Sequence, residues 1–322
     1  MKNKLSATFC KIVILVLASV RFILLPSPSH GDVESSGEGQ WIYEQAEAKF
    51  AARSYSDASF LYRWFLLIGE GSERKWASFK LGLSYERAGD YSQAVEAYRE
   101  ALNEYPALAD YIVYRLGISH MGLGEYSKAV ESFQNVISTY GGSTTLVSYC
   151  YEMMAESYWK IGYYESAIEA YRKVVKINSV YFDIPGIRMK IASLYEETSQ
   201  PKEAVDVYRQ VVELHPNRDY TVAAINRIDG LIREHPEIGY SPSSDDKYKR
   251  SYALYLNSRY KDSIAGFSEL IAEGKALPSL YWRGRAYLAQ RSYQEAINDL
   301  IRVYTLYKDD PLAEDASYYL SL

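Results

Sequence analysis

The sequence predicts an all-α fold, a solenoid in which helix-turn-helix units stack one on the next. Small residues recur in pairs with a constant internal spacing, and a bulky residue follows each pair at a helical interval. Tyrosine is also unusually common, with 33 copies against 9 phenylalanines. A buried tyrosine packs its ring but needs a partner or water for its hydroxyl. This composition therefore favours a thin array of helices over a compact sphere.

The small residues form six pairs, and the two members of each pair lie twelve positions apart. The pairs are Gly82 and Ala94, Gly117 and Ala129, Ala155 and Ala167, Ala192 and Ala204, Ser251 and Ser263, and Gly284 and Ala296. The bulky residues that follow four positions later are Tyr98, Phe133, Tyr171, Tyr208, Phe267 and Leu300. Residues three and four apart share one helix face. We therefore expect each small residue to mark a close crossing of two helices, with the bulky residue filling the space beside it.

Glycines separate the two predicted helices of several units, at Gly89, Gly124 and Gly162. Glycine readily adopts the left-handed conformation that ends a helix. Successive units begin 35, 38 and 37 residues apart, counted from Gly82, and 33 apart from Ser251 to Gly284. These residues resemble the tetratricopeptide repeat, a helix-turn-helix of about 34 residues. The resemblance covers roughly residues 42–322 and implies an all-α solenoid wound as a right-handed superhelix.

The period is interrupted once, because Ala204 and Ser263 lie 59 residues apart. Helical periodicity continues over 221–234, and a stretch rich in proline, serine and aspartate follows. We therefore expect about five repeats over 40–216, a solitary helix and linker over 217–247, and two further repeats over 248–322. The last residues, 311–322, match the first helix of another unit. This end indicates a truncated sequence or, as the alternative, a helix that docks on another chain.

The first 31 residues are predicted to be a signal peptide. Lys2, Lys4 and Lys11 precede an apolar run that ends before a proline and small residues. The run is short for a membrane span of about 20 residues, so an uncleaved anchor is the alternative. Removing this segment with its four basic residues leaves 32 basic and 41 acidic side chains, a net charge of about −9. That balance disfavours nucleic acid and anionic lipid as partners.

No catalytic, cofactor-binding or metal-binding residues are predicted. None of the histidines, His30, His120, His215 and His235, has a second ligand at metal-site spacing. His120 takes a position where most units have tyrosine, so we expect it to be packed. Cys150 is the one cysteine beyond the signal segment and is expected to be an inert core thiol. Neither a glycine-rich phosphate loop nor a G-x-S-x-G motif occurs.

The first helix of each unit is instead expected to line a groove that binds an extended peptide. Residues about one turn either side of the small residue should face this groove. The candidates are Trp76, Phe79, Leu83, Glu86, Arg87, Tyr111, Tyr114, Ile118, Met121, Glu152, Glu156, Trp159, Lys160, Tyr281 and Arg285. The alternative is that about half of them pack against the preceding unit and never touch a ligand.

Three segments are similar to the helical superhelix of soluble lytic murein transglycosylases: 107–117, 281–287 and 310–320. In that family the superhelix precedes a catalytic domain with a Glu-Ser pair and a later Gly-Leu-Met-Gln stretch. Here Glu156-Ser157 lies inside a predicted repeat helix and no such stretch follows. The resemblance therefore implies a scaffold whose catalytic domain is missing. Periplasmic repeat proteins of envelope constriction and outer-membrane assembly lipoproteins share the Tyr-Pro unit ends, but Cys10 is poorly placed for lipidation.

Two hypotheses follow. The first is an exported scaffold that binds a protein or peptide in the cell envelope, most simply the periplasm of a Gram-negative bacterium. The second is the non-catalytic superhelix of a peptidoglycan-cleaving enzyme. Peptidoglycan and its enzymes are additional candidate partners. A membrane would be contacted only through the N-terminal segment, if that segment is retained.

Overall fold

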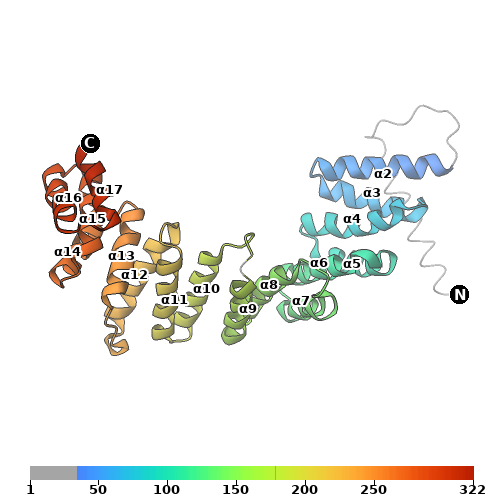
Figure 1. Ribbon diagram of the computed structural model, residues 1–322. Coiled ribbons are helices and arrows are strands. Elements are labelled where there is room, and N and C mark those ends of the chain that lie inside the picture. The colour runs from blue at the N-terminus through green and yellow to red at the C-terminus, as the bar shows by residue number, and fades with distance from the viewer. Residues whose placement is uncertain (1–34, 178) are drawn as a thin grey trace. The chain divides into compact units, whose positions relative to one another are not determined.

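A computed structural model describes residues 35–177 and 179–322, and all the regular structure in these residues is helical (Figure 1). The predicted signal segment, residues 1–31, lies outside the described residues, as do Cys10 and His30. The chain divides into two compact units, Met1–Tyr105 and Pro106–Leu322.

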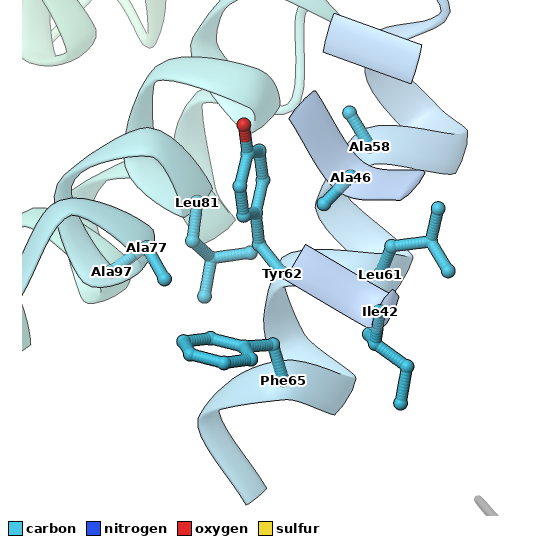
Figure 2. Packing of buried hydrophobic residues seen from close by; sticks show 9 residues of the cluster. All are labelled: Ile42, Ala46, Ala58, Leu61, Tyr62, Phe65, Ala77, Leu81 and Ala97. Carbon is cyan, nitrogen blue, oxygen red and sulfur yellow. The ribbon is translucent and has the colours of Figure 1, made fainter. Parts of the chain in front are cut away.

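The described part of the first unit, residues 35–105, contains four helices, each packed against the next along the chain. They are α2 (Ser35–Ala51), α3 (Tyr55–Ile68), α4 (Glu73–Arg87) and α5 (Tyr91–Glu104). Figure 2 shows how residues of all four helices gather around Tyr62 and Phe65 of α3. Both rings are almost completely buried, and Ala46, Ala58 and Ala77 leave room for them. Small residues therefore set the spacing of the helices, and aromatic rings fill the interior, as the sequence predicted.

The second unit continues the same arrangement over a longer stretch. It contains η1 (Pro106–Leu108), α6 (Ala109–Gly122), α7 (Tyr126–Tyr140), α8 (Val147–Lys160), α9 (Tyr164–Ile177), α10 (Ile184–Glu197), α11 (Pro201–Leu214), α12 (Asp219–Glu234), η2 (Pro236–Ile238), α13 (Ser244–Leu256), α14 (Tyr260–Ala272), α15 (Ala276–Ala289), α16 (Tyr293–Leu306) and α17 (Pro311–Ser321). Figure 1 shows α10 to α13 side by side within this unit.

The interrupted part of the repeat lies inside the second unit. Helix α12 packs against α11 and also contacts α10 and α13. Helix α13 begins at Ser244 with a capping box, in which Ser243 and Asp246 exchange hydrogen bonds with each other's backbone N–H groups. The acidic residues Asp245 and Asp246, placed in the linker from the sequence, therefore form the first turn of a helix.

The predicted close crossings are present. A Cβ added to Gly82 would lie 2.6 Å from the ring of Tyr98, and one added to Gly284 would lie 3.0 Å from Leu300. The predicted turns are present as well, since Gly89, Gly124 and Gly162 all have positive φ angles. At the same place in other units Arg53, Ser199, Ser258 and Arg291 adopt this conformation without being glycine. The left-handed turn residue is thus present in more units than the glycine pattern indicates.

Three tyrosines at equivalent positions satisfy their buried hydroxyls in one way. Tyr62 donates to Glu47 at 2.7 Å, Tyr98 to Glu86 at 2.9 Å and Tyr208 to Glu196 at 2.6 Å. Each acceptor belongs to the preceding helix. The fourth equivalent residue, Tyr171, is fully buried, and its hydroxyl has no hydrogen-bond partner among the described residues.

Candidate functional site

The potentially reactive side chains Cys150 and His120 are packed among the helices. No three His, Cys, Asp or Glu side chains in this part of the chain come together as metal ligands. Cys150 is completely buried, and burial raises its pKa to about 12, so that the thiol stays protonated and unreactive at neutral pH. The ring of His120 is packed as predicted, with Nδ1 at 2.7 Å from Oε2 of Glu125. None of the helices in residues 35–177 and 179–322 combines the length and hydropathy of a membrane span.

Most groove candidates of α4 are buried inside the first unit. Phe79 is buried against the ring of Tyr98, with centroids 6.1 Å apart, and Leu83 is buried as well. Glu86 is buried and accepts the Tyr98 hydroxyl. These three side chains therefore leave little surface for a ligand.

Two candidates of the first unit remain at the surface. Trp76 is exposed and contacts the edges of Phe79 and Tyr105. Arg87 is exposed and donates to the Tyr55 hydroxyl at 3.2 Å. They lie about three turns apart on α4, and the buried Phe79, Leu83 and Glu86 come between them along the helix.

The two candidates of α15 contact each other. Arg285 donates to the hydroxyl of Tyr281 at 2.9 Å, and Tyr281 is buried. The Arg285 guanidinium also lies 3.8 Å from the ring centroid of Tyr319. Trp282 extends this aromatic cluster toward Tyr252, at 4.7 Å between centroids. Arg285 is thus already held by aromatic rings, a contact that the sequence did not reveal.

The candidates of α6 and α8 lie differently, because most of them are only partly buried. This applies to Tyr111, Tyr114, Ile118, Met121, Glu152, Glu156 and Trp159, while Lys160 is exposed. The rings of Tyr111 and Tyr114 stack at 25° with centroids 6.3 Å apart. Helices α6 and α8 contact each other directly.

Two interactions join α8 to α10. Lys190 Nζ lies 2.8 Å from Oε1 of Glu156, and Nε1 of Trp159 donates to Oε2 of Glu197 at 3.0 Å. We call ten partly buried or exposed residues of these three helices the α6–α8–α10 surface. It comprises Tyr111, Tyr114, Ile118, Met121, Glu152, Glu156, Trp159, Lys160, Lys190 and Glu197.

Lys190, Glu197 and Tyr171 were not among the groove candidates, although Tyr171 was predicted as a packing residue of its unit. A repeat-level signal exists for Lys190, which precedes the small residue Ala192 by two positions. Lys80 precedes Gly82 by the same interval, and it pairs with Glu47 as Lys190 pairs with Glu156. Both carboxylates directly follow the small residue of the preceding unit, Ala46 and Ala155. Aligning the units on their small residues would therefore have found the pair.

Burial shapes the electrostatics of this surface. Burial raises the pKa of Glu152, and the neighbouring carboxylate of Glu156 raises it further, whereas Lys190 lowers it. Burial likewise raises the pKa of Tyr114 to about 12, with Arg115 opposing the shift and Glu152 among the smaller contributions to it. Tyr114 and Glu152 each stand three positions before the small residue of their helix, so they take equivalent places on α6 and α8, which contact each other. The surface thus presents an acidic group beside an aromatic one.

A separate cleft of about 360 Å³ lies among α11, α12 and α13, where the repeat is interrupted. Ile225, Ile228 and Ile232 line it with apolar surface. The charged residues at its rim pair with one another, as Arg250 does with Asp229 at 2.5 Å and Lys249 with Glu213 at 2.5 Å. The first pair joins α13 to α12 and the second joins α13 to α11, and the charges that line the cleft cancel.

Family models described as the tetratricopeptide repeat match residues 76–107, 111–143, 148–181, 188–218 and 248–314. No curated protein matches this chain. Among solved structures, the chain is similar to residues 41 to the end of MamA from Desulfovibrio magneticus RS-1. The identity is 16% over 58% of this chain and 99% of that chain, with a TM-score of 0.47.

Two further structures are similar over more of the chain. One is a tetratricopeptide repeat protein from Parabacteroides merdae ATCC 43184, with 14% identity, coverage of 88% of this chain and 99% of that chain, and a TM-score of 0.44. The other is the C-terminal part of a TPR repeat-containing protein from Cytophaga hutchinsonii, with 15% identity, coverage of 85% and 98%, and a TM-score of 0.49. The family models together match more than half of the sequence, and the chain belongs to the tetratricopeptide-repeat family.

Proposed function

We propose that this protein is an exported scaffold that binds an extended segment of another protein along the α6–α8–α10 surface. The observation that carries the proposal is the continuity of this surface. Glu156 and Trp159 of α8 reach Lys190 and Glu197 of α10, and α8 contacts α6 on its other side. Three first helices of successive repeats thus present aromatic, apolar and charged side chains together. Repeat solenoids bind partners through surfaces of this kind.

The composition of the surface supports a polypeptide ligand. Tyr111, Tyr114 and Trp159 offer large, rigid contact areas, which are enriched among residues that dominate protein interfaces. Ile118 and Met121 add apolar area between them, and Met adapts its shape to different ligands. The chain carries a net charge of −5, which disfavours nucleic acid.

The place of action is part of the proposal. The basic and then apolar N-terminal segment supports export, and the Gram-negative periplasm is the compartment that fits it best. The partner would then be a protein of the cell envelope, and the resemblance to the transglycosylase superhelix makes peptidoglycan enzymes the first to test. Fractionation of expressing cells and sequencing of the mature N-terminus test this directly. Export predicts a periplasmic protein that starts near residue 32, and an intact cytoplasmic chain would contradict it.

Site-directed photo-crosslinking tests the binding surface. A photoreactive phenylalanine analogue is placed at Ile118, and a matched probe is placed at Tyr163, which is exposed beyond the end of α8. We expect a crosslinked partner from Ile118 but none from Tyr163. Changing Tyr114 and Trp159 together to Ala should abolish the crosslink. Equal crosslinking at both positions, or a crosslink that survives the double substitution, would sink the proposed surface.

A further inference from the structure

The carboxylate of Glu152 on α8 has no donor. The residue is partly buried, yet no described side chain or backbone group donates a hydrogen bond to it. Desolvating a carboxylate without compensating hydrogen bonds is unfavourable. Glu152 is only partly buried, so its carboxylate is open to a donor that a ligand at the surface can supply.

Lys190 does not supply this hydrogen-bond donor. Lys190 is within electrostatic reach of Glu152, but its ammonium group is bonded to Glu156 at 2.8 Å. The same ammonium lies 5.4 Å from the ring centroid of Tyr171, so it is held from two sides. In the free protein Lys190 therefore pairs with Glu156, and Glu152 has no ion-pair partner among the described residues.

An independent observation comes from Tyr171 on α9. Its hydroxyl is completely buried and unpartnered, whereas the equivalent Tyr98 and Tyr208 each donate to a glutamate of the preceding helix. Those glutamates, Glu86 and Glu196, stand four positions after the small residue. In α8 that position is Trp159. Tyr62 uses another acceptor, Glu47, whose counterpart in α8 is Glu156, but the Tyr171 hydroxyl makes no hydrogen bond to Glu156 or to any other described residue. Tyr171 instead interacts electrostatically with Glu156 and Glu152.

We propose that Glu152 of α8, together with Tyr114 of α6 and Tyr171 of α9, forms a subsite for a lysine or arginine side chain of the bound polypeptide. The cation supplies the donor that Glu152 lacks, and the aliphatic stem of the ligand side chain packs on the Tyr114 ring. Once Glu152 is fixed by the ligand, its second oxygen can accept the Tyr171 hydroxyl. This subsite rests on the proposed function and gives its ligand a chemical class. The net negative charge of the chain also favours a positively charged ligand.

The experiment selects phage-displayed random dodecapeptides on the purified protein and resynthesises the tightest binder. We expect the selected peptides to share a basic residue. Replacing that residue with norleucine should lower the affinity roughly ten- to a hundredfold, the range of a charge-assisted hydrogen bond. Glu152→Gln should cause a similar loss, and the two changes together should cost little more than either alone. Tyr171→Phe should weaken binding a few-fold, because it removes the support of Glu152.

The matched control is Glu169→Gln on α9, which removes one exposed carboxylate and should leave the affinity unchanged. Binding that Trp159→Ala abolishes but Glu152→Gln does not alter would overturn the subsite and leave the proposed surface standing. The absence of any peptide whose binding depends on Trp159 would overturn both. Selected peptides without a basic residue would also refute the subsite.

Discussion

Gly117 of α6 and Phe133 of α7 are packed so closely that a Cβ at Gly117 would lie 2.5 Å from Cε1 of the ring. We predict that Gly117→Ala destabilises the protein by about 1–3 kcal/mol, the range for overpacking a tight core. The ring or the helix must move, because Phe133 is fully buried at this crossing. Urea unfolding followed by circular dichroism measures the change.

Gly142→Ala provides the control for this substitution. A Cβ at Gly142 would meet nothing within 4 Å, so the free energy of unfolding should stay constant or rise slightly. Combining Gly117→Ala with Phe133→Leu should recover part of the loss. The natural precedent is Gly284, where the equivalent residue is Leu300 and a Cβ would lie no closer than 3.0 Å. Equal stability of Gly117→Ala and the parent would show that the crossing is looser than described.

Tyr208 and Tyr171 are equivalent in the repeat but differ in their hydroxyl partners. We predict that Tyr208→Phe costs about 1–2 kcal/mol, because it removes a hydrogen bond to the Glu196 carboxylate. Tyr171→Phe should be neutral or stabilising, since the hydroxyl it removes has no partner among the described residues. Thermal unfolding of the two variants and the parent gives the comparison. A larger loss for Tyr171→Phe would mean that a bound water or a conformational change satisfies its hydroxyl.

The spacing of small residues predicted the fold because it records the closest helix crossings directly. Gly82 and Gly117 were expected at crossings, and both lie against rings. The candidate groove was less predictable. The residue three positions before the small residue is Phe79 in α4, Tyr281 in α15 and Tyr114 in α6. Phe79 and Tyr281 are buried, but Tyr114 is only half-buried. Spacing identifies the helix face, whereas exposure depends on the side chains of the neighbouring helices.

Residues joined across units were also not identified from the spacing of the small residues. Glu196 accepts the Tyr208 hydroxyl and pairs with Arg227 of α12. The interrupted repeat concealed this contact, because α12 has no counterpart in the other units. Lys190 was missed for a related reason, since its partner Glu156 lies 34 residues earlier.

Arg283 and Asp299 form a bidentate ion pair between α15 and α16, with bonds of 2.7 and 2.8 Å. We predict that Arg283→Met costs about 3–5 kcal/mol, because it leaves the carboxylate of Asp299 buried and without its main partner. Arg302→Met, which removes an exposed arginine 4.0 Å from the same carboxylate, should cost less than about 1 kcal/mol. Denaturant unfolding distinguishes them. Similar losses for both would show that Asp299 relies equally on the two arginines.

The buried tyrosines predict unfolding at alkaline pH. Burial raises the pKa of Tyr43 and Tyr114 to about 12 and raises the pKa of Tyr62, Tyr171 and Tyr208 as well. Since the folded state holds these protons more tightly than the unfolded chain, their contribution to stability is complete below pH 10 and is lost as the pH rises beyond it. Absorbance at 295 nm should therefore show a group of tyrosines that ionise only as the helices melt. Complete ionisation near pH 10 with the helices intact would contradict this expectation.

Glu152 predicts a pH dependence that connects stability with binding. Burial and Glu156 raise its pKa, so the folded state favours the protonated carboxyl more than the unfolded chain does. Its contribution to stability is then complete below pH 4.5 and declines as the pH rises through the folded pKa. Glu152→Gln should therefore raise the melting temperature at pH 7, and the difference from the parent should shrink on acidification. Glu169→Gln, an exposed carboxylate, should show no such trend. A Glu152→Gln variant that melts lower at pH 7 would mean that the carboxylate is already paired in the free protein, and the subsite would lose its reason to recruit a cation.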